Sequence, residues 1–346
     1  MVKFSFALLL GLVCGVTTTS PAGAQSRAIP KSSARVERAS PTAPPVAPAG
    51  DDIVVTAMRR NLERTTSDVR SITGVHRGQF ARFETAVCPL VLGVERRLAV
   101  AIEERIRLLA EQIGLRGAKA GCATNLTIIA ADDGRRVILA LQKKFPRLLE
   151  SLSGAEATRL KQEPGPVWNW YSIDPKRRDG APVEHVSQVA FGSGPPKPVS
   201  PNAYIASNVT MSRLTEPVRM ELAHSFVVIS SDAARGLNVQ QFGDLAGVLA
   251  LSTINTKGVG QLSTASVLQL LSTDTASKVR IEGATAFDLA YLRALYSGDA
   301  GYSADQQAVR LALSIMRSRG EATQTSRDPD AAADSAGGPE PSDRSR

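Results

Sequence analysis

The chain has 346 residues with 41 Lys and Arg against 33 Asp and Glu, a formal net charge of +8 at pH 7. Aromatic residues make up only 5% of the sequence, which argues against the base-stacking surfaces of single-stranded nucleic-acid-binding proteins. Residues 26–82 hold ten Lys and Arg against five Asp and Glu (net +5) and Lys3 adds +1, so residues 83–346 carry only +2, and the pattern favours a basic, solvated arm over a groove for DNA.

Residues 1–24 have the features of a secretory signal peptide. Lys3 precedes an apolar run from Phe4 to Val16 that is too short to span a bilayer, and Ala22-Gly23-Ala24 is a small-residue cleavage site. We expect cleavage after Ala24 and export of a soluble chain to the periplasm of a Gram-negative envelope. No later segment reaches the roughly eighteen uninterrupted apolar residues of a spanning helix, so no transmembrane segment is expected after cleavage.

Residues 25–82 are predicted to form a disordered basic arm. Gln25 to Gly50 is rich in Ala, Pro, Ser and Arg and holds few large apolar residues. Within the arm, the stretch DDIVVTAMRR is β-prone, because β-branched residues follow one another from Ile53 to Thr56. A short strand is therefore expected over residues 52–57.

Two cysteines, Cys88 and Cys122, remain once the signal peptide is removed. In an oxidising compartment such a pair is most simply a disulfide. Two buried free thiols are the alternative, and a zinc site is a poorer interpretation because no histidine lies near either cysteine in the sequence.

Residues 83–191 are predicted to form a disulfide-tied α/β unit. The stretch VERRLAVAIEERIRLLAEQIG predicts a helix that ends at Gly114. A buried strand is expected from Asn125 to Ala131, a helix in RVILALQKKF, and an aromatic-rich strand from Val167 to Ile173. The expected core stripe of the first helix consists of Leu98, Ile102, Ile106, Leu109 and Ile113.

Residues 202–317 are predicted to contain strands followed by a helical region. The stretch SFVVIS, Ser225 to Ser230, is short and uniformly apolar, as a central strand should be. The next helix is expected in VQQFGDLAGVLALSTI with Asn238 as its N-cap. Its expected core stripe consists of Phe242, Leu245, Val248, Leu249 and Ile254.

Three further helical segments are expected at residues 264–271, 285–296 and 303–317, and residues 318–346 are expected to form a disordered tail. The predicted fold class is α+β. It consists of a small mixed sheet packed with C-terminal helices, between a disordered N-terminal arm and a disordered C-terminal tail.

Familiar catalytic motifs are absent from the sequence. The histidines, His76, His185 and His224, are not at helical ligand spacing, and there is no H-E-x-x-H, Walker loop, G-x-G-x-x-G or G-x-S-x-G. Each histidine is more simply a surface or capped side chain than a metal ligand.

The carboxylates give no clearer signal. Asp132 and Asp133 precede Gly134 as in an ordinary turn, and Asp174 and Asp179 flank a basic turn. We expect no catalytic residue, no metal site and no cofactor, although a Ser-His-Asp set assembled in space stays open.

The last third of the chain, from SFVVIS through GLNVQQFGDLAGVLALS to TAFDLAYLRALYSGDAGYSADQQAVRLALSIM, resembles uncharacterised exported bacterial proteins with a zinc-protease-like C-terminal half. In those proteins the helix after the strand carries an H-E pattern. Here Gln240, Gln241 and Asp244 stand where metal ligands or the general base would be, and Gln is a poor zinc ligand. The resemblance implies a protease-like fold without the metal motif.

The stretch DDIVVTAMRR resembles the TonB box of outer-membrane TonB-dependent receptors. In those receptors the box is an extended strand that adds to the edge of a sheet in the energy-coupling protein, so the resemblance implies a TonB-like protein partner. About 290 residues follow, without the alternating ten-residue strands of a transmembrane barrel, and the chain is not expected to be a receptor. The matching residues are Asp52, Ile53, Val54, Val55, Thr56 and Ala57.

Two function classes follow from these observations. The first is a soluble, non-catalytic periplasmic binding or accessory protein of unknown ligand, which docks through its N-terminal strand. The alternative is a degenerate or unorthodox cell-envelope hydrolase with a protease-like fold. That residues 52–57 pair within the protein's own sheet, or stay disordered, also remains open, and no nucleic-acid partner is expected.

Overall fold

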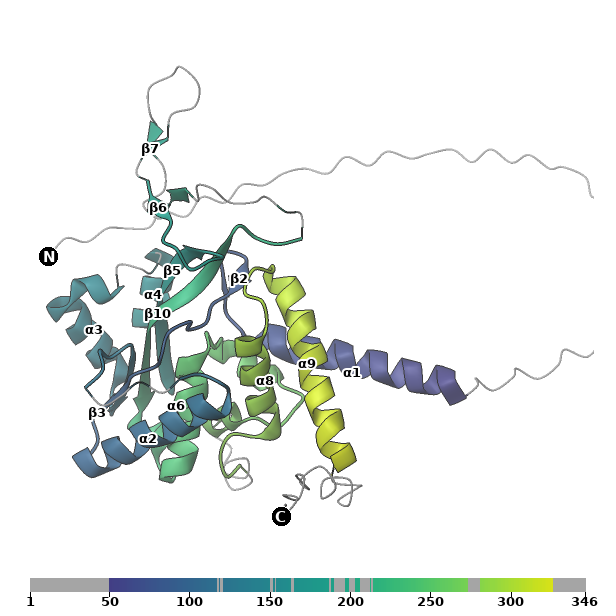
Figure 1. Ribbon diagram of the computed structural model, residues 1–346. Coiled ribbons are helices and arrows are strands. Elements are labelled where there is room, and N and C mark those ends of the chain that lie inside the picture. Colours follow the sequence, from purple (N-terminus) through teal and green to yellow (C-terminus); the bar gives the residue numbers. More distant parts are fainter. Residues whose placement is uncertain are drawn as a thin grey trace, which may run out of the picture. The chain divides into compact units, whose positions relative to one another are not determined.

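A four-stranded mixed sheet lies at the centre of the computed structural model, with helices on both of its faces (Figure 1). The chain divides into two units, residues 1–48 and residues 49–346, and all described residues belong to the second. The first unit, which includes the predicted signal peptide, lies outside the described residues. The α+β class and the small mixed sheet are as predicted. The structure describes residues 50–116, 118, 121–149, 152, 154–162, 165–186, 188–189, 197–198, 203–205, 212, 214–272 and 281–325.

The sheet has the strand order β3-β4-β10-β5. Strands β3, β4 and β10 run parallel to one another, and β5 runs antiparallel to β10 and forms one edge. Because β10 lies between β4 and β5, the segments 83–191 and 202–317 share one sheet. The strands predicted from their apolar and aromatic runs are confirmed. Their bounds are Leu126–Ala131 (β4), Val167–Arg177 (β5) and Val218–Ser230 (β10), whereas the edge strand Pro89–Leu92 (β3) had not been predicted.

The larger part of the core lies on the sheet face covered by α2 (Arg96–Gln112) and α6 (Val239–Leu251). The predicted stripe of α2 is buried from Ile102 to Ile113, but Leu98 is 38% exposed and Ala99 takes the buried position of the first turn. The predicted stripe of α6 is buried throughout. The apolar periodicity therefore identified both helices and, apart from Leu98, their buried faces.

Helix α6 packs directly on α2 because it carries glycines one turn apart. A Cβ atom on Gly243 would lie 2.7 Å from Arg105 Cγ, and one on Gly247 would lie 2.6 Å from Leu109 Cδ2. Both positions are closer than a real Cβ contact allows, so only glycine permits this approach. The helix begins with a capping box, as Asn238 Oδ1 accepts from Gln241 N and Gln241 Oε1 accepts from Asn238 N.

The opposite face of the sheet carries a smaller core. The covering elements are α3 (Gly134–Lys144), the 3₁₀ turn η1 (Pro146–Leu149) and α4 (Gly154–Gln162). Trp170 of β5 stacks on Phe226 of β10 with ring centroids 4.9 Å apart. This small cluster anchors α4 beside the edge strand, because Leu160 of α4 belongs to it.

Residues Gly50–Ile72 form helix α1, so the strand predicted for residues 52–57 is wrong. The pattern that decides the conformation lies further on, where Thr65, Thr66, Val69 and Ile72 are buried at helical spacing. This face packs on α9 (Ala304–Thr325), and the two helices cross in Figure 1. Because Thr65 and Thr66 are polar residues, this buried face does not show as an apolar stripe in the sequence, and the helix was not predicted.

The predicted disordered arm, residues 25–82, is also too long. Residues 50–72 are helical, and Phe80 and Ala81 have 1% and 0% of their surface exposed, so residues 50–82 belong to the folded body. The predicted tail also begins too early, because α9 continues to Thr325. The remaining parts of both predictions, residues 25–49 and 326–346, lie outside the described residues.

The predicted disulfide between Cys88 and Cys122 is present, with Cα atoms 6.1 Å apart. It joins the residues just before β3 and β4, two strands that pair in parallel. Asn125 adds to this junction, since Cys88 N donates to Asn125 Oδ1 at 2.7 Å. The bridge therefore holds the start of the parallel pair in register.

The remaining elements are short or C-terminal. The helix predicted at 264–271 is a 3₁₀ turn, and α8 matches the prediction for 285–296. None of the helices among the described residues has the length and apolarity that crossing a membrane requires. The bounds are Val75–His76 (β1), Gln79–Phe80 (β2), Glu184–His185 (β6), Gln188–Val189 (β7), Lys197–Pro198 (β8), Tyr204–Ile205 (β9), Ser231–Ala234 (α5), Thr256–Gln261 (η2), Val267–Leu271 (η3) and Ala286–Ser297 (α8).

Candidate functional site

Two adjoining cavities follow the outer edge of β5, and together they form what we call the edge groove. The wide end, about 920 Å³, is lined by residues of β1, α4, β5 and the turn after α6. The narrow end, about 500 Å³, is lined by residues of α4, β5, η2 and η3. The two ends share Arg159, Leu160, Asn169 and Thr256, so they adjoin.

The backbone of β5 faces this groove with open hydrogen-bonding positions. Ser230 N donates to Pro166 O. Because hydrogen-bonded positions alternate along an antiparallel ladder, the backbone N–H and C=O groups of Trp168 and Trp170 then point towards β10. The N–H and C=O groups of Val167, Asn169 and Tyr171 consequently point to the outer edge. Among the described residues no strand pairs with this part of β5, and the first contact on that edge is the bridge between Lys176 and Pro182.

The floor of the groove is fixed by Tyr171. Its hydroxyl donates to Leu249 O at 3.0 Å and accepts from Ile254 N at 3.0 Å and from Asn169 Nδ2 at 2.6 Å. Burial raises the pKa of Tyr171, and the hydrogen bond from Asn169 and the positive charge of Arg159 act in the opposite direction. The ring thus stays neutral and ties β5 to the end of α6.

The wide end has acid–base groups on opposite walls. The His76 ring lies edge-on to the Tyr171 ring, with centroids 6.3 Å apart. Burial lowers the pKa of His76, and the negative charge of Glu156 on α4 partly opposes this shift. Two arginines of this end are engaged, since Arg70 pairs with Asp305 at 3.0 Å and Arg77 lies over the Tyr204 ring at 5.0 Å.

The positions on α6 that the resemblance matches to metal ligands are held by contacts within the protein. Both oxygens of Asp244 accept from Arg105, at 2.6 and 2.8 Å, and Oδ2 also accepts from Ala284 N at 2.8 Å. Gln241 completes the capping box and donates to Ile281 O at 2.7 Å. Gln240 is exposed at the start of the helix. This donor set does not fit a zinc site.

Two further buried carboxylates join segments of the C-terminal half. Asp288 accepts from Ser266 Oγ at 2.5 Å and from Val267 N at 2.8 Å, and burial raises its pKa while these bonds oppose the shift. Asp68 of α1 accepts from Ser263 N at 2.9 Å and from Thr264 Oγ1 at 3.0 Å. Each satisfies backbone donors that would otherwise be buried, so both have structural roles.

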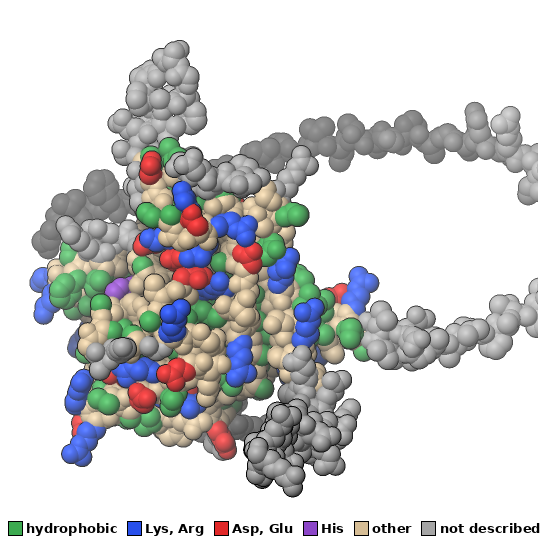
Figure 2. Space-filling model, in the orientation of Figure 1, with side chains coloured by type: hydrophobic (Ala, Val, Ile, Leu, Met, Phe, Trp, Pro, Cys, Tyr) green, Lys and Arg blue, Asp and Glu red, His purple; other side chains and the backbone are tan. Residues whose placement is uncertain are grey.

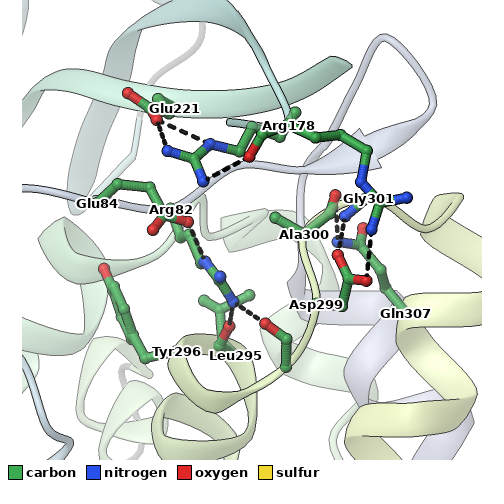
Figure 3. A network of polar contacts seen from close by, with 12 residues as sticks. Arg82, Glu84, Arg178, Glu221, Leu295, Tyr296, Asp299, Ala300, Gly301 and Gln307 are labelled. Carbon is green, nitrogen blue, oxygen red and sulfur yellow. Dashed lines mark hydrogen bonds and ion pairs between the residues drawn. The ribbon is translucent and has the colours of Figure 1, made fainter. Parts of the chain in front are cut away.

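A polar network lies away from the edge groove, where the chain before β3 meets the loop between α8 and α9 (Figure 3). Arg82 Nη1 donates to Leu295 O at 2.5 Å and to Gly298 O at 2.6 Å, and Arg178 pairs with Asp299 at 2.8 Å. The partners are backbone carbonyls and carboxylates of the chain itself. Among the described residues, the charged side chains of this network are paired with groups of the chain itself.

The other residues considered from sequence are dispersed. His224 stacks on Phe226 with centroids 5.2 Å apart, and the side chain of His185 lies outside the described residues. Asp133 caps α3 by accepting from Arg136 N, and Asp179 pairs with Arg177 across its own turn. Of the singled-out residues, only His76 and Asp174 line the edge groove. Residues Asp52, Ile53, Val54, Val55, Thr56 and Ala57 lie near the start of α1.

The residues that shape the groove were not anticipated. Arg159, Asn169 and Lys257 come from α4, β5 and η2, and no motif connects them along the sequence. The one signal that could have pointed here is the irregular alternation in VWNWYSI, where a polar Asn stands between two tryptophans.

Charge on the visible surface is mixed. On the face shown in Figure 2, Lys and Arg side chains are interspersed with Asp and Glu. Within the described ranges, no group of three or more His, Cys, Asp and Glu is placed to hold a metal ion. A comparison with protein-family models, curated proteins and solved structures found no match to this chain, so the site has to be interpreted from its own geometry.

Proposed function

We propose that this chain is an exported, non-catalytic binding or accessory protein of the cell envelope, which holds an extended peptide segment of a partner protein in the edge groove. The observation that carries the proposal is the open outer edge of β5, where Val167, Asn169 and Tyr171 offer paired donors and acceptors. An extended segment that adds to such an edge gains affinity from its main chain and specificity from neighbouring pockets. Export is supported by the signal-peptide features and by the disulfide.

The groove has the dimensions of a peptide site. From Val167 to Pro175 the strand covers nine positions at roughly 3.3 Å each, about 30 Å of extended chain. Leu160 on α4 and Val259 on η2 provide apolar contacts on opposite walls of the narrow end, and Asn169 lies where the two ends meet. Such a site binds a partner without any group acting on it chemically.

Blocking the groove tests the proposal directly. Gly260 lines the narrow end, and a Cβ there would meet no atom within 4 Å, so Gly260→Trp should introduce a bulky side chain at this end without a backbone clash. Gly320 on α9 is equally open but does not line the groove, and Gly320→Trp is the matched control. The probe is a displayed library of random peptides about ten residues long, from which the tightest binders of the unmodified chain are synthesised and titrated.

We expect the selected peptides to bind the unmodified chain and Gly320→Trp equally, and Gly260→Trp at least about tenfold more weakly. N-methylation of alternate peptide nitrogens should abolish binding in one register and leave it unchanged in the other, because only one edge of the peptide meets β5. Equal binding to all three chains, or no selected peptide, would overturn the proposal.

Docking through residues 52–57 is a separate proposal. Thr56, Ala57 and Met58 are exposed at the end of α1 that extends away from the sheet in Figure 1. Strand addition to a TonB-like partner requires this end to unwind, which the β-branched run Ile53 to Thr56 makes inexpensive. The chain should capture the periplasmic domain of TonB, and a Val54→Pro Val55→Pro variant should not. Equal capture by both chains, or by neither, would exclude this docking mode.

The alternative of a hydrolase has less support. His76 and Glu156 line the same end of the groove, but the described contacts of His76 include no hydrogen bond to Ser, Thr or Cys. The hydroxyl of Thr73, which also lines this end, is engaged by Val69 O at 2.7 Å and Tyr291 Oη at 3.0 Å. The binding role needs none of the groups that hydrolysis would require.

A further inference from the structure

We infer that the narrow end of the edge groove binds the free carboxyl terminus of the partner peptide, with an apolar final side chain. This inference rests on the proposed function and specifies the ligand of the same site. It follows from the different charges at the two ends of the groove, from the apolar side chains beside the cations of the narrow end, and from the direction in which β5 runs through it.

The charge of the groove is not uniform. The wide end is lined by Glu156 and Asp174 as well as by basic residues. The narrow end is lined by Arg159 and Lys257, and none of the described residues that line it is acidic. A negative group is therefore favoured at the narrow end, where both cations attract it.

Arg159 is available for this role. It is exposed on α4, it lines both ends of the groove, and it forms none of the ion pairs among the described residues. Its positive charge opposes the effect of burial on the pKa of Tyr171, so the guanidinium exerts an electrostatic influence on the residue at the floor of the groove. A planar guanidinium can bind a carboxylate through two parallel N–H donors.

The walls of the narrow end combine polar groups with apolar side chains. A terminal residue fits this combination because its carboxylate and its apolar side chain leave the same atom, the last Cα, in different directions. An acidic side chain within a peptide would instead fill the apolar space with its own polar group, at a desolvation cost. The apolar residues lining this end are Leu160, Val167, Trp168, Val259, Leu262 and Leu271.

Charge also determines the direction of the peptide. Strand β5 runs from Val167 at the narrow end to Pro175 at the wide end. A parallel peptide that begins in the groove would place its terminal ammonium beside Arg159 and Lys257. An antiparallel peptide places its carboxylate there, and this is also the more stable ladder geometry per residue.

Peptides that differ only at their last atoms test the inference. Two libraries of random peptides about ten residues long are screened, one ending in a free carboxylate and one in a carboxamide, and each selected sequence is synthesised in both forms. We expect acids to bind at least about tenfold more tightly than amides, since a charge-assisted hydrogen bond is lost in the amide. Arg159→Gln should weaken the acid form about tenfold and leave the amide form unchanged.

Arg136→Gln is the matched control, because Arg136 is 87% exposed on α3 and does not line the groove. A third peptide carries Asp as its last residue with a carboxamide end, and it should bind no better than the plain amide. Acid and amide forms of equal affinity that are still blocked by Gly260→Trp would overturn the inference and leave the proposed function standing. Equal weakening of both forms by Arg159→Gln would also overturn it, whereas loss of all groove binding would remove the proposed function itself.

Discussion

Replacing Asp244 with Asn should destabilise the protein by about 2 to 3 kcal/mol. The carboxylate has no exposed surface and receives two N–H groups of Arg105 and the backbone N–H of Ala284. Removing one partner of a buried pair costs about 3 to 5 kcal/mol, because the other charge is left uncompensated. Arg105 retains 25% side-chain exposure, so solvent screens part of this loss and the expected value falls to about 2 to 3 kcal/mol, at or below the lower end of that range. Asn keeps one oxygen for Ala284 N, which separates the effect of charge from that of the missing acceptor.

Urea unfolding followed by circular dichroism at pH 7 measures the loss in the free energy of unfolding. In a thermal melt the same loss corresponds to a melting temperature about 5 to 10 °C lower. Asp232→Asn is the control, since Asp232 pairs with Arg235 at 2.7 Å but both side chains are about 80% exposed, and its loss should stay within about 0.5 kcal/mol. An Arg105→Gln Asp244→Asn double variant should lose less than the sum of the single variants. A loss below about 1 kcal/mol for Asp244→Asn, or equal losses for Asp244→Asn and Asp232→Asn, would refute this account of how α2 and α6 are joined.

Three other outcomes are expected. Replacing Cys88 and Cys122 with Ser should lower the free energy of unfolding by roughly 4 kcal/mol, from the 34-residue separation, and a melting temperature insensitive to reductant would contradict this. Gly247→Ala should destabilise the protein, because its Cβ would lie 2.6 Å from Leu109 Cδ2, whereas Gly320→Ala in open space should stabilise it by about 0.5 to 1 kcal/mol. Chemical denaturation of both variants measures the two changes, and changes of the same sign would refute the packing argument. Burial lowers the pKa of His76 and His224, so the unfolded chain binds more protons than the folded chain below about pH 6.5, and the free energy of unfolding should fall as the pH is lowered through that range. Urea unfolding at several pH values should show a weaker dependence of this free energy on pH for His76→Gln His224→Gln. An unchanged dependence would refute this explanation.

The regular part of the fold was predictable because its sequence patterns agree with its packing. The apolar residues from Ile102 to Ile113 repeat at helical spacing and pack on α6, and Phe226 to Ile229 are apolar because the sheet is covered on both faces there. The N-cap at Asn238 and the disulfide depend on local chemistry and were equally accessible. Helix α1 was not predicted, since its buried face includes Thr65 and Thr66 and its first turns carry β-branched residues.

The candidate site could not be predicted, for a reason of topology. Which strand forms the edge depends on the insertion of β10 between β4 and β5, and these pairings join residues about 40 to 100 positions apart. Only after β5 is placed at the edge do Arg159 and Lys257 become two walls of one groove. His76 was noticed as an isolated histidine, and the structure gives it Tyr171 and Glu156 as neighbours.

The pairing of α1 with α9 has a consequence for how the molecule is made. The first helix of the described fold buries Thr65, Val69 and Ile72 against a helix about 240 residues later, so these contacts close only after nearly the whole chain has been synthesised. Contacts so distant in sequence form late in folding. Until α9 has been synthesised, the buried face of α1 lacks its contact with that helix, so the fold of the described body cannot be completed while the chain is still growing.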